Sequence, residues 1–136
     1  MVFSSQLPQK QFVVEPYPIN HKNAIIGSQQ QMHNTVRAAI GDLRRVVSAI
    51  SVKYWSESVA PGDYGYMHEK AKLESCMSHL TEARANTKKS SPEWSQLNAT
   101  VKMVRQASHY HIRLDECTAA LTSLCSFERQ TFPPSK

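Results

Sequence analysis

The fold is decided by residues 36–54, which read VRAAIGDLRRVVSAISVKY. Apolar side chains recur along this stretch in steps of four and three, which places them on one face of an amphipathic helix. The members of this stripe are Val36, Ile40, Leu43, Val47, Ile50 and Tyr54. The pattern predicts a helix over residues 28–59.

Gly41 and Asp42 are the local signal against an unbroken helix in this stretch. Glycine suits the position that ends a helix, and aspartate suits the position that caps the next one. The apolar stripe nevertheless continues in phase across the pair, so we expect one continuous helix. A bundle of four helices, with a break at Gly41-Asp42, is the alternative.

Two proline-containing stops divide the rest of the chain. Pro61-Gly62-Asp63 ends the first helix and supplies a cap for the second, and Ser91-Pro92-Glu93 provides the start of the third. We therefore expect further helices over residues 64–88 and 92–129. Short connections make successive helices antiparallel. The predicted architecture is all-α: an up-down-up antiparallel three-helix bundle of coiled-coil type over residues 28–130, followed by a tail over 131–136.

Residues 1–27 have a different character, because Pro8, Pro16 and Pro18 interrupt them. Proline fixes its own φ and biases the preceding residue toward extended conformations, so this segment is predicted to be an extended strap. It carries no basic stretch leading into an apolar core and does not have the pattern of a secretory signal peptide. The strap has two alternative roles, covering the first helix or binding a partner.

Composition limits the classes of function. The chain has 136 residues, 40% of them hydrophobic and 20% charged, which suits a single globular domain. Four glycines and the lack of a long apolar run argue against a dinucleotide-binding fold and a membrane span. Three cysteines give no disulfide framework, so reduced thiols and an intracellular, cytoplasmic location are expected. The lack of a secretory signal peptide is also compatible with delivery of the protein into another cell by a route that does not use one.

Candidate metal and catalytic residues lack supporting partners. Cys76 and His79 lie one helical turn apart and would need two further ligands to hold zinc. His109 and His111 point in different directions if they lie on a helix, and so cannot both complete such a site. A catalytic nucleophile needs a base and an orienting acid, which loops of a few residues do not assemble. We expect no enzymatic activity, no metal and no cofactor.

The most informative feature is a second apolar patch on the predicted first helix. Val52, Trp55 and Val59 lie on the flank away from the core stripe, and Arg37 and Arg44 lie on that same flank. Tryptophan and arginine are enriched at the centres of protein interfaces. These residues predict a non-enzymatic protein-interaction module, an adaptor, regulatory subunit or effector-type protein. The partner is another protein or a second copy of the chain, with the strap folding back over the patch as the alternative.

A second class of function rests on the formal net charge of +5. The arginines of the first helix would make the chain a nucleic-acid-binding subunit without sequence specificity. On an ideal helix, Arg45 and Lys53 point away from the flank of Arg37 and Arg44, so the basic cluster is split. Nucleic acid is therefore the alternative to a protein partner.

Overall fold

The computed structural model describes residues 18–134, with side chains from residue 28 onward. The chain divides into two compact units, Met1–Gln30 and Gln31–Lys136. The described part of the first unit is helical. All packing described below concerns the second unit.

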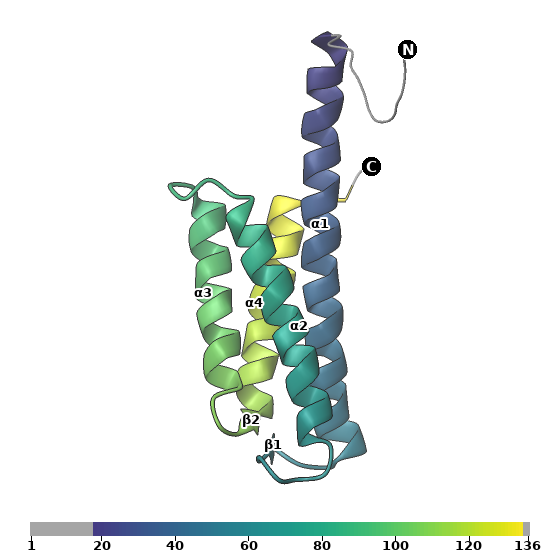
Figure 1. Cartoon of the computed structure of the whole chain (residues 1–136), viewed down its shortest axis with the longest axis vertical. Coiled ribbons are helices and arrows are strands. Elements are labelled where there is room, and N and C mark those ends of the chain that lie inside the picture. Colours follow the sequence, from purple (N-terminus) through teal and green to yellow (C-terminus); the bar gives the residue numbers. More distant parts are fainter. Residues whose placement is uncertain (1–17, 135–136) are drawn as a thin grey trace, which may run out of the picture. The chain divides into compact units, whose positions relative to one another are not determined.

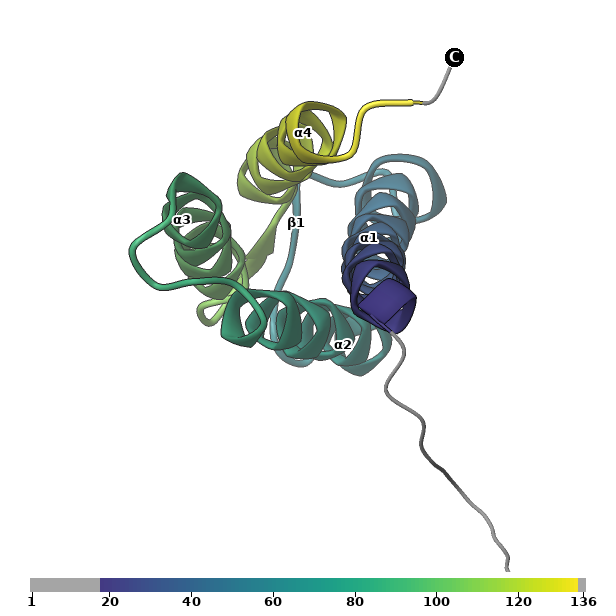
Figure 2. The ribbon, with the colours of Figure 1, turned by 90° about the horizontal axis from the view of Figure 1, so that it is seen from above.

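Four α-helices account for most of the described residues. Their bounds are α1 Pro18–Ser48, α2 Tyr66–Ala85, α3 Pro92–Ala107 and α4 Leu114–Thr131. Within the second unit, successive helices run in opposite directions (Figure 1), and in the end-on view they stand in a ring with α4 between α3 and α1 (Figure 2). The prediction of a mostly helical fold is confirmed, whereas packing of the coiled-coil type stays a prediction.

The single helix predicted over residues 92–129 is wrong, because two helices occupy this range. α3 ends at Ala107 and α4 begins at Leu114, with Tyr110 between them in the left-handed region at φ 65°. The Ser108 hydroxyl donates to the carbonyl of Val104 at 3.0 Å, and the Arg113 guanidinium donates to the carbonyl of Gln106 at 2.9 Å. These bonds add side-chain donors to carbonyls at the end of α3, where the regular helical hydrogen bonding stops.

The alternative break at Gly41-Asp42 is also absent, because α1 passes through both residues without interruption. A Cβ at Gly41 would meet only the side chain of Arg45 at ordinary contact distance, so nothing in the packing requires a glycine there. That alternative gives the correct number of helices, four, but the unexpected break lies between α3 and α4 and not at Gly41-Asp42.

The first helix also differs from its predicted range of 28–59. It begins at Pro18, where proline suits a first turn, so residues 18–27 of the predicted strap are helical. Residues 1–17 of the strap lie outside the described part of the chain. At the other end α1 passes into a π-helix, η1, over Ala49–Lys53, and the helical course stops there.

A short antiparallel pair of strands joins two of the loops. β1 is Ser58–Val59 and β2 is Ile112–Arg113, with Val59 opposite Ile112 and Ser58 opposite Arg113. The amide of Leu114 donates to the carbonyl of Glu57 at 2.8 Å and extends the pairing. The pair therefore fastens the loop before α2 to the loop before α4 at one end of the bundle (Figure 1).

The core contains most of the predicted stripes. From α1 it takes Val36, Ile40 and Leu43 and from η1 it takes Ile50, while Val47 and Tyr54 are half-buried at its edge. From α2 it takes Tyr66, Leu73, Cys76, Leu80 and Ala83. Among the described residues, the buried polar or charged side chains are Glu69 and Thr100. The Thr100 hydroxyl donates to the carbonyl of Gln96 at 3.0 Å, which removes the penalty for burying it.

Candidate functional site

Large apolar side chains are left in solvent at one end of the bundle. The exposed ones in the described part of the chain are Val52, Trp55, Tyr64, Met67 and Tyr110. They belong to η1, to the loop before α2, to the first turn of α2 and to the loop after α3. Those segments lie at the end of the bundle where β1 and β2 pair (Figure 1). A concentration of this kind marks an interaction surface more often than scattered single residues do.

Trp55 is the most exposed of these side chains and has an unfavourable backbone conformation. Its side chain is 86% exposed, and its φ of 52° lies in the left-handed region. For a residue with a Cβ this conformation costs roughly 1–2 kcal/mol. The side chain gains no burial that would offset the cost. Strain that persists without a structural benefit is found most often at functional sites.

The π-helix η1 sets the direction of the side chains before Trp55. The amide of Tyr54 donates to the carbonyl of Ala49 at 2.9 Å, five residues back, which closes the wide π turn. Each residue of a π turn advances less around the axis than in an α-helix. Val52 and Lys53 are therefore turned back toward the side of Arg44 and Arg45, which an ideal α-helix would not achieve for Lys53.

The result is a surface hollow of about 430 Å³ at the C-terminal end of α1, which we call the basic hollow. Its lining residues are Arg44, Arg45, Ser48, Ala49, Val52, Lys53 and Lys72. Lys72 comes from α2, so two helices build the hollow. Arg44, Arg45 and Lys53, which ideal helix geometry divides between two sides, all line this hollow. The guanidinium of Arg44 nevertheless contacts Cys125 of α4, whereas that of Arg45 contacts Asp42.

The four cations of the basic hollow differ in their partners. Arg45 pairs with Asp42 at 3.2 Å, and Lys72 pairs with the buried carboxylate of Glu69 at 3.3 Å. Arg44 contacts the sulfur of Cys125 at 3.9 Å instead. Lys53 lies over the ring of Tyr54, with its ammonium nitrogen 5.6 Å from the ring centroid. Two of the cations are thus balanced by carboxylates of this chain, and two are not.

Tyr54 and Glu69 hold this corner of the fold together. The Tyr54 hydroxyl donates to Glu69 Oε2 at 2.9 Å, and Glu69 lies in the first turn of α2, where the helix dipole favours a negative charge. Burial, the hydrogen bond to Glu69 and the charge of Glu69 raise the pKa of Tyr54 to about 12. Gly65 has φ 86°, and a Cβ there would overlap the Tyr54 hydroxyl. This contact fixes the end of η1 against α2.

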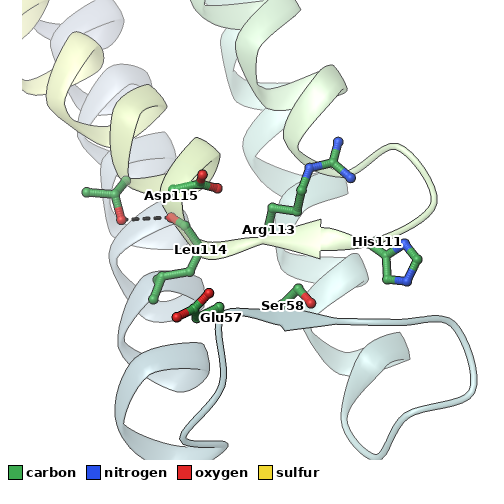
Figure 3. Close-up of a pocket in the computed structure, with 7 residues that line it drawn as sticks. Glu57, Ser58, His111, Arg113, Leu114 and Asp115 are labelled. Carbon is green, nitrogen blue, oxygen red and sulfur yellow. Dashed lines mark hydrogen bonds between the residues drawn. The ribbon is translucent and has the colours of Figure 1, made fainter.

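A larger pocket of about 810 Å³ lies beside the strand pair (Figure 3). Its lining residues are Glu57, Ser58, His111, Arg113, Leu114, Asp115 and Thr118. Arg113 is engaged by Glu116 at 2.7 Å, and it lies between His111 and Asp115 in Figure 3. In the described residues no hydrogen bond links Ser58, His111 and Asp115 to one another. The residue types of a catalytic triad are present without the contacts that activate a nucleophile.

Cys76 and His79 do not gather further ligands. Burial, and secondarily the charge of Asp42 and the neighbouring Cys117, raise the pKa of Cys76 to about 12. The His79 ring nitrogen lies 3.9 Å from Asp42 Oδ2, a buried oxygen that has no hydrogen-bond donor within the described chain. Over residues 18–134 no group of three or more metal-ligating side chains is found. His109 and His111 lie in the loop after α3 rather than on a helix.

All three cysteines are free thiols. In the described part of the chain, no helix is both long enough and apolar enough to cross a bilayer. Comparison of the chain with protein-family models, with curated proteins and with solved structures gives no match.

The structure brings together part of the predicted interface. Arg44 and Val52 line the basic hollow, and Trp55 lies two residues after the end of η1. Arg37 is exposed on α1 but does not line the hollow. Val59 is the residue whose predicted exposure is wrong: it is 2% exposed and pairs with Ile112 in the strand pair. The helix on which the exposure of Val59 was predicted ends at Lys53. Val59 therefore does not lie on a helix, and helix geometry does not give the direction of its side chain.

Sequence reasoning missed the contributions of Arg45, Lys53 and Lys72 to this surface. For Lys53 the missing information was the π turn, which has no simple sequence signature. Lys72 reaches the hollow through the packing of α2 on α1, which no local pattern reports. Tyr64 and Met67 were also missed, although their position beside Pro61-Gly62-Asp63 marked them as members of a loop and a first turn.

Proposed function

We propose that this chain is a non-enzymatic protein-interaction module that binds its partner through Trp55, Val52 and the basic hollow. The observation that carries the proposal is Trp55, which is 86% exposed and held at φ 52°. Interface hot spots are enriched in tryptophan and arginine, and they gain their energy when a partner excludes water from them. A partner that covered Trp55 would supply the burial that the isolated chain lacks.

The arrangement of the surface supports a protein partner in a second way. Val52 is 65% exposed and lies one helical turn before Trp55, with arginine and lysine side chains around it. An apolar centre with a charged rim is the usual anatomy of a protein interface. A second copy of the chain would meet the same requirement, because a two-fold interface uses one patch twice.

Nucleic acid is the second candidate, and one observation favours it. Arg44, Arg45 and Lys53 line the same hollow, so the basic cluster is more concentrated than ideal helix geometry predicts. Single-stranded nucleic acids are bound by cations that follow the backbone and by exposed aromatic rings on which bases stack. Trp55 would provide such a ring.

Affinity capture from native extract tests the proposal, with the full chain carrying Trp55→Asp compared with the unchanged chain. We expect Trp55→Asp to lose the captured protein, or to abolish self-association in sedimentation velocity if the partner is a second copy. Gln96→Asp is the control, because it places the same new charge at an exposed position on α3 that does not line the basic hollow. Unchanged capture and unchanged self-association by a folded Trp55→Asp variant would contradict the proposal.

A further inference from the structure

We infer that the partner presents an acidic segment to the basic hollow, with carboxylates facing Arg44 and Lys53 and an apolar side chain against Val52. This inference rests on the proposed function and names the chemistry of the partner. The lining of the hollow includes four cations, Arg44, Arg45, Lys53 and Lys72, and no acidic residue. The remaining lining residues are Ser48, Ala49 and Val52.

The charge of the hollow is only half compensated within the described chain. Asp42 and Glu69 neutralise Arg45 and Lys72. Arg44 and Lys53 also line the hollow, and the contacts of their charged groups are the thiol of Cys125 and the ring of Tyr54. Like charges brought together in this way repel one another, and a bound carboxylate removes that repulsion while forming charge-assisted hydrogen bonds. The hollow is therefore complementary to a ligand with at least two negative groups.

The form of the surface favours an acidic protein segment over nucleic acid. Phosphate binding gains affinity from many cations that track a backbone, whereas these four line one hollow. The next exposed cation along α1, Arg37, is seven residues before Arg44, which is about 10 Å along a helix. Two exposed acids, Glu57 and Asp63, lie in the same loop as Trp55. Their charges would repel a phosphate backbone that ran from the hollow toward Trp55.

Val52 adds an apolar requirement to the electrostatic one. It lines the hollow and leaves 65% of its surface in solvent. A purely polyanionic ligand would leave this surface wet, whereas an acidic segment with one large apolar side chain would cover it. Burial of apolar surface contributes about 25 cal/mol per Å² to the binding free energy. The position of the apolar side chain would also set the register of the segment along the hollow.

Selection from a random displayed peptide library against the full-length chain tests this inference. We expect the selected peptides to combine aspartate or glutamate with a large apolar residue. Binding of a selected, fluorescently labelled peptide should weaken about tenfold in the double variant Arg44→Ala/Lys53→Ala and fall as salt is raised. These two positions suit the test because neither side chain pairs with a carboxylate in the described structure, so their loss should not disturb the fold.

The matched control is Lys102→Ala/Arg105→Ala, which removes the same charge from exposed positions on α3 and should leave binding unchanged. Selected peptides without an excess of acids, which still depend on Trp55, would overturn the acidic segment and leave the interaction module standing. Peptides that bind Trp55→Asp as well as the unchanged chain would overturn both. Tighter, salt-sensitive binding of a labelled single-stranded RNA would overturn the acidic segment in favour of nucleic acid. Self-association that is lost in Arg44→Ala/Lys53→Ala would assign the hollow to a second copy.

Discussion

Trp55 and Tyr110 show which properties of a single residue could be predicted from this sequence and which could not. Trp55 is exposed as predicted, although it lies beyond Lys53, where the helix on which its exposure was predicted ends. The left-handed backbone of Trp55 and Tyr110 could not be predicted, because neither is a residue type that favours positive φ. Such conformations are imposed by the segments around them, here the end of η1 and the break after α3.

This strain gives a prediction for stability. Trp55→Asn should raise the free energy of unfolding by about 1 kcal/mol, because asparagine tolerates positive φ and an exposed tryptophan contributes little burial. The measurement is equilibrium unfolding in urea, with Tyr110→Asn expected to behave in the same way. A lower unfolding free energy for Trp55→Asn would show that the indole makes stabilising contacts in the folded chain. In the capture experiment the same variant should bind its partner less well, although it is more stable.

Among the secondary-structure elements, the start of α3 at Pro92 was predictable, whereas both ends of the first helix and the break after α3 were not. α3 begins at Pro92 as expected, with the Ser91 hydroxyl accepting a hydrogen bond from the amide of Trp94 at 3.2 Å. The break after Ala107 escaped detection because Ala107 and Leu114, seven residues apart, keep the apolar stripe in phase. The strand pair escaped because its strands are two residues long and come from distant loops. Pairing of this kind is a tertiary event.

Val52 lies in η1 and Val59 lies in β1, so the same side chain occupies two different elements. Substituting each valine tests whether the strand pair stabilises the fold. Val59→Ala should lower the free energy of unfolding by about 2 kcal/mol, because it empties a packed position opposite Ile112. Val52→Ala should change it by less than about 0.5 kcal/mol, because Val52 is exposed. Urea unfolding of both variants measures the difference. Equal losses at the two positions would mean that the strand pair does not form.

For the molecule as a whole, periodicity identified which residues enter the core, but not how many helices surround it. The stripe predicted for the first helix is buried largely as expected, because amphipathic patterns report burial directly. The number of helices depends on where a turn interrupts a pattern, and one unrecognised turn changed three helices into four. The candidate site was likewise predicted only where local sequence decides the position of a residue. Val52 and Trp55 were visible in the sequence, whereas the basic hollow required α2 to pack beside α1.

Cysteine labelling reports the integrity of this four-helix core. Cys76 and Cys117 are fully buried, and burial is the main cause that raises the pKa of each thiol to about 12, while Cys125 is only half-buried. At pH 8 we expect Cys125 to react first with a thiol reagent, and the other two at least about a thousandfold more slowly, when the bundle opens. Mass spectrometry of peptides from timed samples assigns the sites.

The same two thiols predict how stability depends on pH. Between the ordinary cysteine pKa of 9 and the raised value of about 12, the unfolded chain loses protons that the folded chain keeps. The thiol contribution to stability is therefore complete below pH 9 and is lost as the pH rises toward 12. The free energy of unfolding should fall over this range, and less steeply in Cys76→Ala/Cys117→Ala. An equal slope in that variant, or prompt labelling of Cys76 in the folded chain, would mean that solvent reaches the space between α2 and α4 and that the four helices do not enclose a dry core.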